Sequence, residues 1–258
     1  MEPTHPLNRE NYFMTRYLKL TMASAIAVAL GLAIAIPQVE AVSMLQLTSG
    51  GTTITITDED FSAATANTAP DGFAGAGIVT WVGSIGVFNI SFTAGVSKPL
   101  LGGANNPNMH LTSLQVSSFS GGDIEVKFTD TDFTLPLASG LNSFISAIGG
   151  TTTGTVNSFE TYFDEGNVAF GTTTQLASLG SFSGSVSNPV YGGSSASSLL
   201  PTTSPYSLTM ITKITHNAGG QSTSVDANII ANPEPATLLL FGTGLIGLGA
   251  WRWRKTRS

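Results

Sequence analysis

The sequence predicts an all-β protein: an antiparallel β-sandwich of jelly-roll type, flanked by an N-terminal signal-peptide helix and a C-terminal transmembrane helix. Short runs of alternating apolar and polar residues, separated by Gly, Asn and Pro, fill residues 42–231. No long amphipathic helical pattern interrupts these runs, and an uncharged apolar run lies near each end of the chain. We therefore expect three segments: 1–41, 42–231 and 232–258.

The first segment has the features of a secretory signal peptide. Arg16 and Lys19 precede an uncharged apolar run at residues 25–36, and small residues then allow a cut after Ala41. The polar residues before Met14 fit this signal poorly, which favours Met14 as the true start. The predicted partners are the Sec machinery and signal peptidase. The alternative is a retained N-terminal membrane anchor.

The middle segment alternates with period two, as strands of an antiparallel sheet do when one face is buried. About ten such runs are typical of a sandwich. The predicted inward-facing residues are Ile54 and Ile56; Phe88, Ile90 and Phe92; Ile124, Val126 and Phe128; Leu208, Met210 and Ile214; and Val225, Ala227 and Ile229.

Three stretches of this body interrupt the strand pattern. Residues 63–77 and 188–205 are rich in Gly, Ser, Ala and Pro and indicate surface loops. Glycines around residues 140–154 allow one short helix at residues 141–148.

Trp81 is expected in the core. The alternative is that its ring is exposed and forms a platform on which a sugar stacks.

The last segment combines three parts in a fixed order. Pro233, Glu234 and Pro235 form a short motif in which the prolines restrict φ and keep the chain extended. Residues 236–251 follow without a charge and would span about 24 Å as a helix, short for a hydrocarbon core of about 30 Å. A membrane stop signal of four cations ends the chain: Arg252, Arg254, Lys255 and Arg257.

This tail resembles the PEP-CTERM sorting signal of Gram-negative bacteria. The resemblance covers only about a tenth of the chain, but the order of the parts, their terminal position and the signal peptide all agree with it. It implies processing at or near the Pro-Glu-Pro motif by exosortase, a membrane-embedded transpeptidase-like protease, in a species that makes extracellular polysaccharide. The removed tail parallels that of a GPI signal. A tail anchor that is never processed is the alternative.

The charge of the body excludes one class of partner. Residues 42–232 hold three lysines and twelve acidic side chains, a formal charge of −9. Nucleic-acid binding depends mainly on Lys and Arg, so we expect no nucleic-acid partner. The chain also has no cysteine, so neither disulfides nor thiol chemistry contribute.

The body is poor in catalytic residue types. It has two histidines, His110 and His216, and neither a Gly-x-Ser-x-Gly elbow nor a His-Glu-x-x-His motif. A Ser/His/Asp triad stays open, because triads are recognised by geometry and not by sequence order. We predict that the protein is not an enzyme.

Two acidic clusters are the candidate metal ligands. Asp130 and Asp132 occupy alternate positions, and residues 58–60 read Asp-Glu-Asp. Such oxygens suit Ca²⁺, but the ion needs six to eight of them. We predict solvated loops and no cofactor, with Ca²⁺ at Asp130 and Asp132 as the weaker alternative.

Three hypotheses for function follow. The first is an exported, non-enzymatic protein of the cell surface or extracellular matrix, structural or adhesive in an exopolysaccharide or biofilm context, which passes through an inner-membrane intermediate. The second is a carbohydrate-binding module delivered by the same route, with exopolysaccharide as its partner. The third is a secreted hydrolase, which needs a cleft with convergent polar groups.

Overall fold

The computed structural model describes residues 42–135 and 141–233, which fold into two antiparallel sheets and contain strands but no helix. The all-β, two-sheet prediction is confirmed. The predicted signal helix and C-terminal membrane helix lie outside the described residues. Within residues 42–135 and 141–233, no helix is long and apolar enough to cross a membrane.

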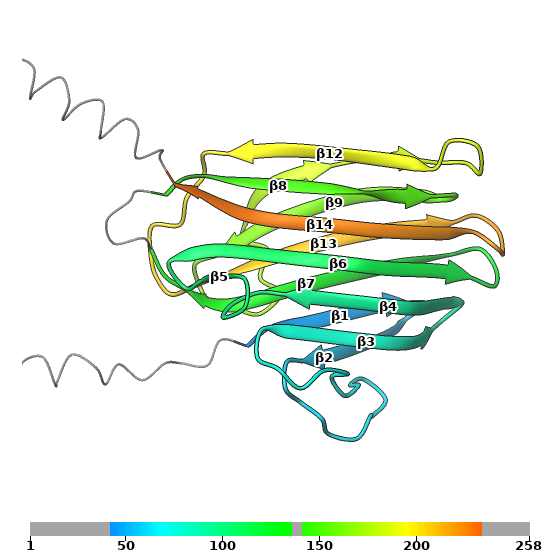
Figure 1. Ribbon diagram of the computed structural model, residues 1–258, viewed down its shortest axis with the longest axis horizontal. Coiled ribbons are helices and arrows are strands. Elements are labelled where there is room, and N and C mark those ends of the chain that lie inside the picture. Colours follow the sequence, from blue (N-terminus) through cyan, green and yellow to red (C-terminus); the bar gives the residue numbers. More distant parts are fainter. Residues whose placement is uncertain (1–41, 136–140, 234–258) are drawn as a thin grey trace, which may run out of the picture. The chain divides into compact units, whose positions relative to one another are not determined.

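Each sheet has seven strands (Figure 1). The first sheet has the order β10-β9-β13-β7-β1-β2, with β11 paired to β9. Its strands are β1 (Met44–Ser49), β2 (Thr52–Thr57), β7 (Gly122–Phe133), β9 (Thr155–Asp164), β10 (Thr174–Leu179), β11 (Phe182–Ser183) and β13 (Tyr206–His216). The second sheet has the order β12-β8-β14-β6-β4-β3, with β5 paired to β6. Its strands are β3 (Ile78–Ile85), β4 (Phe88–Val96), β5 (Gly102–Gly103), β6 (Asn106–Ser118), β8 (Leu141–Thr152), β12 (Val190–Ser197) and β14 (Ser222–Pro233).

The inner faces of the two sheets form one hydrophobic core. In β7, Ile124, Val126 and Phe128 are buried while the residues between them point outward, as the alternation predicts. The inward assignments in β13 and β14 are confirmed in the same way. Sheets packed face to face require this arrangement, because each strand can bury only every second side chain against the facing layer.

Strand β4 breaks the alternation. Phe88 and Ile90 are buried as predicted, but Phe92 is 42% exposed. The register between β4 and β6 shifts between Ile90 and Phe92 and again before Ala94. A β-bulge adds a residue to one strand and reverses which side chains face inward, so the inward assignment of Phe92 was wrong.

Two predicted non-strand segments are strands. The predicted helix at residues 141–148 is part of β8, a strand paired on both sides by β12 and β14. Its alternation is hidden in the sequence because the inward position between Phe144 and Ile148 is a serine. Ser146 is 1% exposed and shares a 2.8 Å hydrogen bond with the Thr161 hydroxyl of the facing sheet. The burial of a polar residue is tolerated here because its hydroxyl is paired.

The predicted loop at residues 188–205 contains β12, an edge strand of mostly Gly and Ser. An edge strand needs a partner on one side only, and it buries little apart from Tyr191. The predicted loop at residues 63–77 lies outside the strands, held by an isolated bridge between Thr55 and Thr68. Trp81 is 9% exposed, which agrees with its expected place in the core.

We predict that Gly95→Ala destabilises the sandwich. A Cβ at Gly95 would lie 2.3 Å from Cε2 of the buried Phe128 ring in the facing sheet. Overpacking of this kind costs about 1–3 kcal/mol. Urea denaturation of the exported protein measures the free energy of unfolding.

Gly103→Ala is the matched control for this substitution. Its added Cβ meets no atom closer than 3.8 Å, so we expect a change within about 0.5 kcal/mol. Equal effects of the two substitutions would contradict the packing of Gly95 against Phe128.

Candidate functional site

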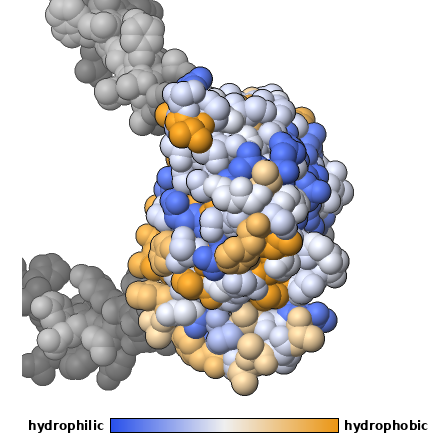
Figure 2. Space-filling view, turned by 90° about the vertical axis from the view of Figure 1, so that its right-hand side faces the viewer, coloured by the Kyte–Doolittle hydropathy of each residue, from blue (hydrophilic) through white to orange (hydrophobic). Residues whose placement is uncertain are grey.

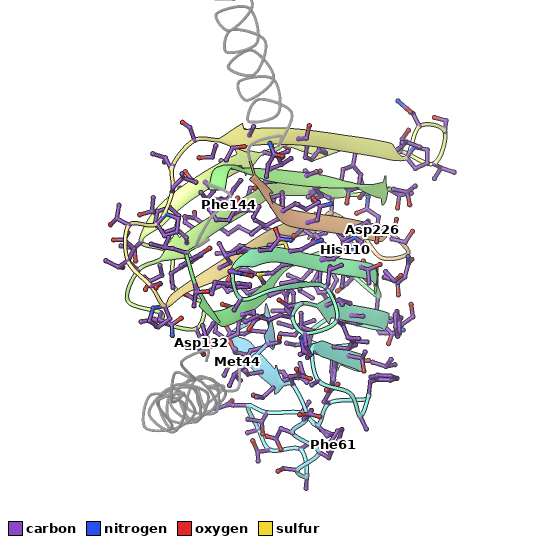
Figure 3. All side chains as sticks on the ribbon, turned by 60° about the vertical axis from the view of Figure 1, so that its left-hand side comes forward. Met44, Phe61, His110, Asp132, Phe144 and Asp226 are labelled. Atoms are coloured by element: carbon purple, nitrogen blue, oxygen red, sulfur yellow. The ribbon has the colours of Figure 1, made fainter. Side chains whose placement is uncertain are left out.

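Both ends of the described chain lie at the same end of the sandwich (Figure 1). The Val42 N–H donates to the Thr131 hydroxyl at 3.5 Å, near the end of β7. At the other terminus, Pro233 is paired with Leu141, where β8 begins. Since β7 leads into β8, the chain enters and leaves the body at one end, which we call the terminal end. Figure 3 shows Met44 and Asp132 there.

Most of the predicted sorting residues lie outside the described part of the chain. Pro233 is the last residue of β14, whereas Glu234, Pro235 and the four cations of the stop signal lie outside the described residues. The predicted signal cleavage after Ala41 also lies outside them, directly before the first described residue.

A band of polar side chains crosses the outer face of the first sheet. Glu125 contacts Lys127 at 2.9 Å and Lys213 at 3.9 Å, and Lys213 also lies 3.6 Å from Glu160. The Tyr162 hydroxyl donates to Glu160 at 2.9 Å. The band spans β7, β13 and β9, neighbouring strands whose outward positions are in register.

The band also covers an apolar side chain. Ile211 points outward from β13 but is 5% exposed. Its cross-strand partners are Lys127 in β7 and Glu160 in β9. Long charged side chains can lay their methylene stems over apolar surface while their charged groups stay in water. The ion pairs themselves are partly exposed and contribute little to stability.

An open depression of about 470 Å³ lies at one end of this band, opposite the terminal end. Its lining residues come from β1 and the turn that follows it, and from β7, β9 and β13: Thr48, Ser49, Gly50, Asp123, Ile124, Glu125, Asn157, Lys213 and Ile214. Figure 2 shows the body from the end opposite the terminal end. On this surface, apolar residues form separate patches among hydrophilic ones.

The polar groups of the depression are already paired with one another. Thr215 donates its hydroxyl to Asp123, and the Asn157 amide donates to the Thr215 hydroxyl at 2.6 Å. Glu125 is held by the two lysines of the band. Carboxylates, amides and ammonium groups in this arrangement can bind hydroxyl-rich ligands, and their mutual pairing suits binding better than proton transfer.

The predicted metal pair is divided between two environments. Asp130 is fully buried and contacts Lys98 Nζ at 2.9 Å. Asp132 is partly exposed and accepts a 2.8 Å hydrogen bond from the Asn167 amide. Each carboxylate thus has partners of its own. Among residues 42–135 and 141–233, no three His, Cys, Asp or Glu side chains are placed to hold a metal ion.

The acidic residues at 58–60 are anchored to the loop that follows them. Asp58 accepts a 2.6 Å hydrogen bond from the Gly77 N–H, while buried Asp71 accepts from the Thr80 N–H at 2.9 Å and the Glu59 N–H at 3.2 Å. Burial raises the pKa of Asp58 to about 6, with smaller raising contributions from Asp71, Glu59 and Asp130. These carboxylates hold the loop in place by accepting hydrogen bonds from nearby backbone N–H groups.

The two histidines of the body are far from equivalent. His216 is 1% exposed, and its ring nitrogens lie 2.8 Å from the Ser118 hydroxyl and 2.9 Å from the Thr223 hydroxyl. Burial lowers the pKa of His216 and favours the neutral ring. A Ser–His contact therefore exists, but a hydroxyl occupies the place that an orienting carboxylate takes in a triad. His110 lies on the outer face of the second sheet, on the strand beside that of Asp226 (Figure 3).

The sequence analysis did not identify Lys98, whose side chain is buried against Asp130. In the sequence it is one of three body lysines with no motif around it. Its partner Asp130 is 32 positions away and belongs to the other sheet. Only the stacking of the sheets brings the two together. The polar band was equally hidden, although the inward-facing residues of β7 were predicted.

The described fold is a two-sheet antiparallel β-sandwich, and the C-terminal end of the chain carries a recognised sorting motif. Residues 233–255 match the family model of the PEP-CTERM protein-sorting motif. The chain is a PEP-CTERM sorting domain-containing protein. This motif implies an exported protein that exosortase processes at the membrane.

Solved structures give weak alignments. The carbohydrate-binding module TmCBM61 in complex with β-1,4-galactotriose aligns with a TM-score of 0.31 and 7% identity, over 60% of this chain and 83% of that chain. The module TmCBM27, known for specific mannan recognition, aligns with a TM-score of 0.27 and 10% identity, over 58% of this chain and 86% of that chain. Both TM-scores are too low to bear on fold or ligand. No curated protein matches the sequence.

We predict that Asp58→Asn stabilises the fold at pH 8 and not at pH 4. The pKa of Asp58 rises from 3.8 to about 6 on folding, so the folded state binds a proton between these values that the unfolded state does not. The group's contribution to stability therefore falls as pH rises through about 6. The amide keeps an acceptor for the Gly77 N–H. The gain at pH 8 is about 1 kcal/mol after discounting for partial exposure, measured by urea denaturation at each pH.

Asp60→Asn is the control from the same acidic run. Hydrogen bonds from the Ser62 hydroxyl and N–H hold the pKa of Asp60 below its usual range, so its neutral variant should gain nothing at pH 8. A pH-independent effect of Asp58→Asn would contradict the assignment.

Proposed function

We propose that this chain is a non-enzymatic, structural or adhesive protein of the bacterial surface or extracellular matrix, in an exopolysaccharide or biofilm context. One observation carries the proposal. The first described strand begins at Met44, and the last one ends at Pro233, where the matched sorting motif begins. A body built from these strands could be released whole when the two predicted flanking signals are removed.

The common position of the two chain ends supports the same route. The chain enters and leaves the body at the terminal end, so both flanking segments connect there. An export intermediate held by those segments would keep that end toward the membrane and direct the depression outward. Consecutive strands from β6 to β9 and from β12 to β14 alternate between the sheets, which supports the jelly-roll type.

The second candidate is a carbohydrate-binding module delivered in the same way. The depression at the far end favours it, since Asp123, Glu125, Asn157 and Lys213 offer both donors and acceptors there. Sugar hydroxyls need such mixed groups, and Tyr162 adds a half-buried aromatic ring further along the same face.

We predict that replacing Pro233, Glu234 and Pro235 together by alanine blocks processing. The variant should accumulate in the membrane fraction with its C-terminal tail attached, because the recognised motif is gone. Immunoblots of cell fractions, with one epitope in the body and one after Arg257, measure this. Thr237→Ala leaves the motif intact and serves as the control. Normal release of the triple variant would contradict processing at this motif.

For the binding hypothesis, we predict that Glu125→Ala combined with Lys213→Ala weakens retention on the bacterium's own exopolysaccharide about tenfold. Affinity electrophoresis in gels containing that polysaccharide measures the retention. Gln115→Ala changes an exposed residue of the other sheet and should leave retention unchanged. Equal retention of all three proteins would exclude the depression as the binding site, and no retention of any would leave the structural role.

A further inference from the structure

A buried amine and a buried carboxyl group connect the two sheets. Lys98 follows β4 of the second sheet, and Asp130 lies in β7 of the first. The Nζ atom of Lys98 is 2.9 Å from Oδ2 of Asp130, and the two side chains are 8% and 0% exposed. The other ion pairs of the described residues lie on the partly exposed polar band.

The contact between Lys98 and Asp130 lies in a mainly apolar site, where three polar groups of Ser97 and Thr131 also contact the pair. The ring centroid of Phe133 is 3.9 Å from Nζ, and the Tyr206 ring packs 5.9 Å from that of Phe133. The Ser97 hydroxyl donates to Oδ2 at 2.6 Å, and the Thr131 N–H donates to Oδ1 at 2.8 Å. Nζ also donates to the Thr131 carbonyl oxygen.

Burial in this site shifts both groups toward their uncharged forms. Burial lowers the pKa of Lys98, although the nearby Asp130 and Asp132 offset part of that effect. Burial raises the pKa of Asp130, against the opposing effect of Lys98 and the hydrogen bonds that it accepts. A neutral amine is a nucleophile, and a protonated carboxyl group is an electrophile with a leaving group that can depart as water.

We propose that Lys98 and Asp130 condense into an intramolecular amide, a covalent isopeptide bond between the two sheets. The Nζ lone pair attacks Cγ of the protonated carboxyl group. Oδ1 takes the negative charge, where the Thr131 N–H stabilises it as an oxyanion-hole donor does. The Cγ–Oδ2 bond then breaks, and Oδ2 leaves as water with its own proton and one proton from Nζ.

The reaction balances without any other reactant. One amine and one carboxylic acid give one amide and one water, with no change of oxidation state. The hydrogen bond from Ser97 holds Oδ2 next to the attacking nitrogen, and the Thr131 carbonyl oxygen orients the amine through a second contact. Because the contact already places Nζ within 2.9 Å of the carboxyl group, proximity supplies much of the rate.

The bond would give a cysteine-free exported protein a covalent link between its layers. It would close a loop between residues 32 positions apart and so restrict the unfolded chain, as a disulfide does. Unlike a disulfide, an amide is indifferent to the redox state of its surroundings. The inference goes beyond the proposed function and does not depend on which surface ligand the body binds.

Peptide mass spectrometry of the full-length chain tests the proposal. Trypsin cuts after Lys127, which lies between the two residues, so an unlinked chain gives separate fragments carrying Lys98 and Asp130. The proposal predicts, in most molecules, one branched species with the summed mass of both fragments less one water, and fragment ions that place the junction at Lys98 and Asp130. Two separate fragments of full mass, or a junction at any other lysine, would overturn it.

Two variants sharpen the test. Lys98→Arg replaces the amine by a guanidinium that stays protonated and supplies no nucleophilic lone pair, so the branched species should vanish. Lys213→Arg changes a partly exposed lysine of the polar band and should leave the branched species intact. If Lys98→Arg fails to fold, the unaltered chain still decides the question, because its own fragments are either joined or separate.

Discussion

Two sheets can pack face to face only when alternate residues of every strand supply an apolar inner surface, and this requirement governs the whole body. Leu45, Phe128 and Phe144 are fully buried members of the resulting core. Several polar groups of this interior are paired: Ser146 with Thr161, Thr152 with Thr223, and His216 with its two hydroxyl partners. Others, such as the hydroxyls of Thr93 and Thr212, are buried without a hydrogen-bond partner among the described residues. Lys98 and Asp130 are a further buried pair, because their ionisable groups contact each other.

This construction suits a chain that folds after export. The body has no cysteine, so its stability does not depend on the redox state of its compartment. Both chain ends leave from the terminal end, while the polar depression lies at the opposite end. Under the proposed function, attachment and ligand binding would therefore lie at opposite ends of the body.

A structural feature could be predicted from the sequence when its pattern lies within a short stretch of residues. The alternation in β7 and β13 and the linear Pro-Glu-Pro motif can each be recognised within a dozen residues, and both were predicted correctly. Strand β8 was missed because a paired serine occupies an inward position, and β12 because an edge strand needs few apolar residues. Phe92 was misplaced because a bulge leaves no clear sequence mark. The Lys98–Asp130 contact and the polar band arise only when distant strands are stacked or paired, so no local pattern records them.

The central claim is that residues 42–233 form an exported passenger whose flanking segments are removed. The intact mass of the protein recovered outside the cell tests this most directly. The account predicts a chain that begins at Val42 and ends within or shortly after the Pro233–Pro235 motif. A mass that still includes the apolar run before Ala41, or residues 236–258, would contradict it.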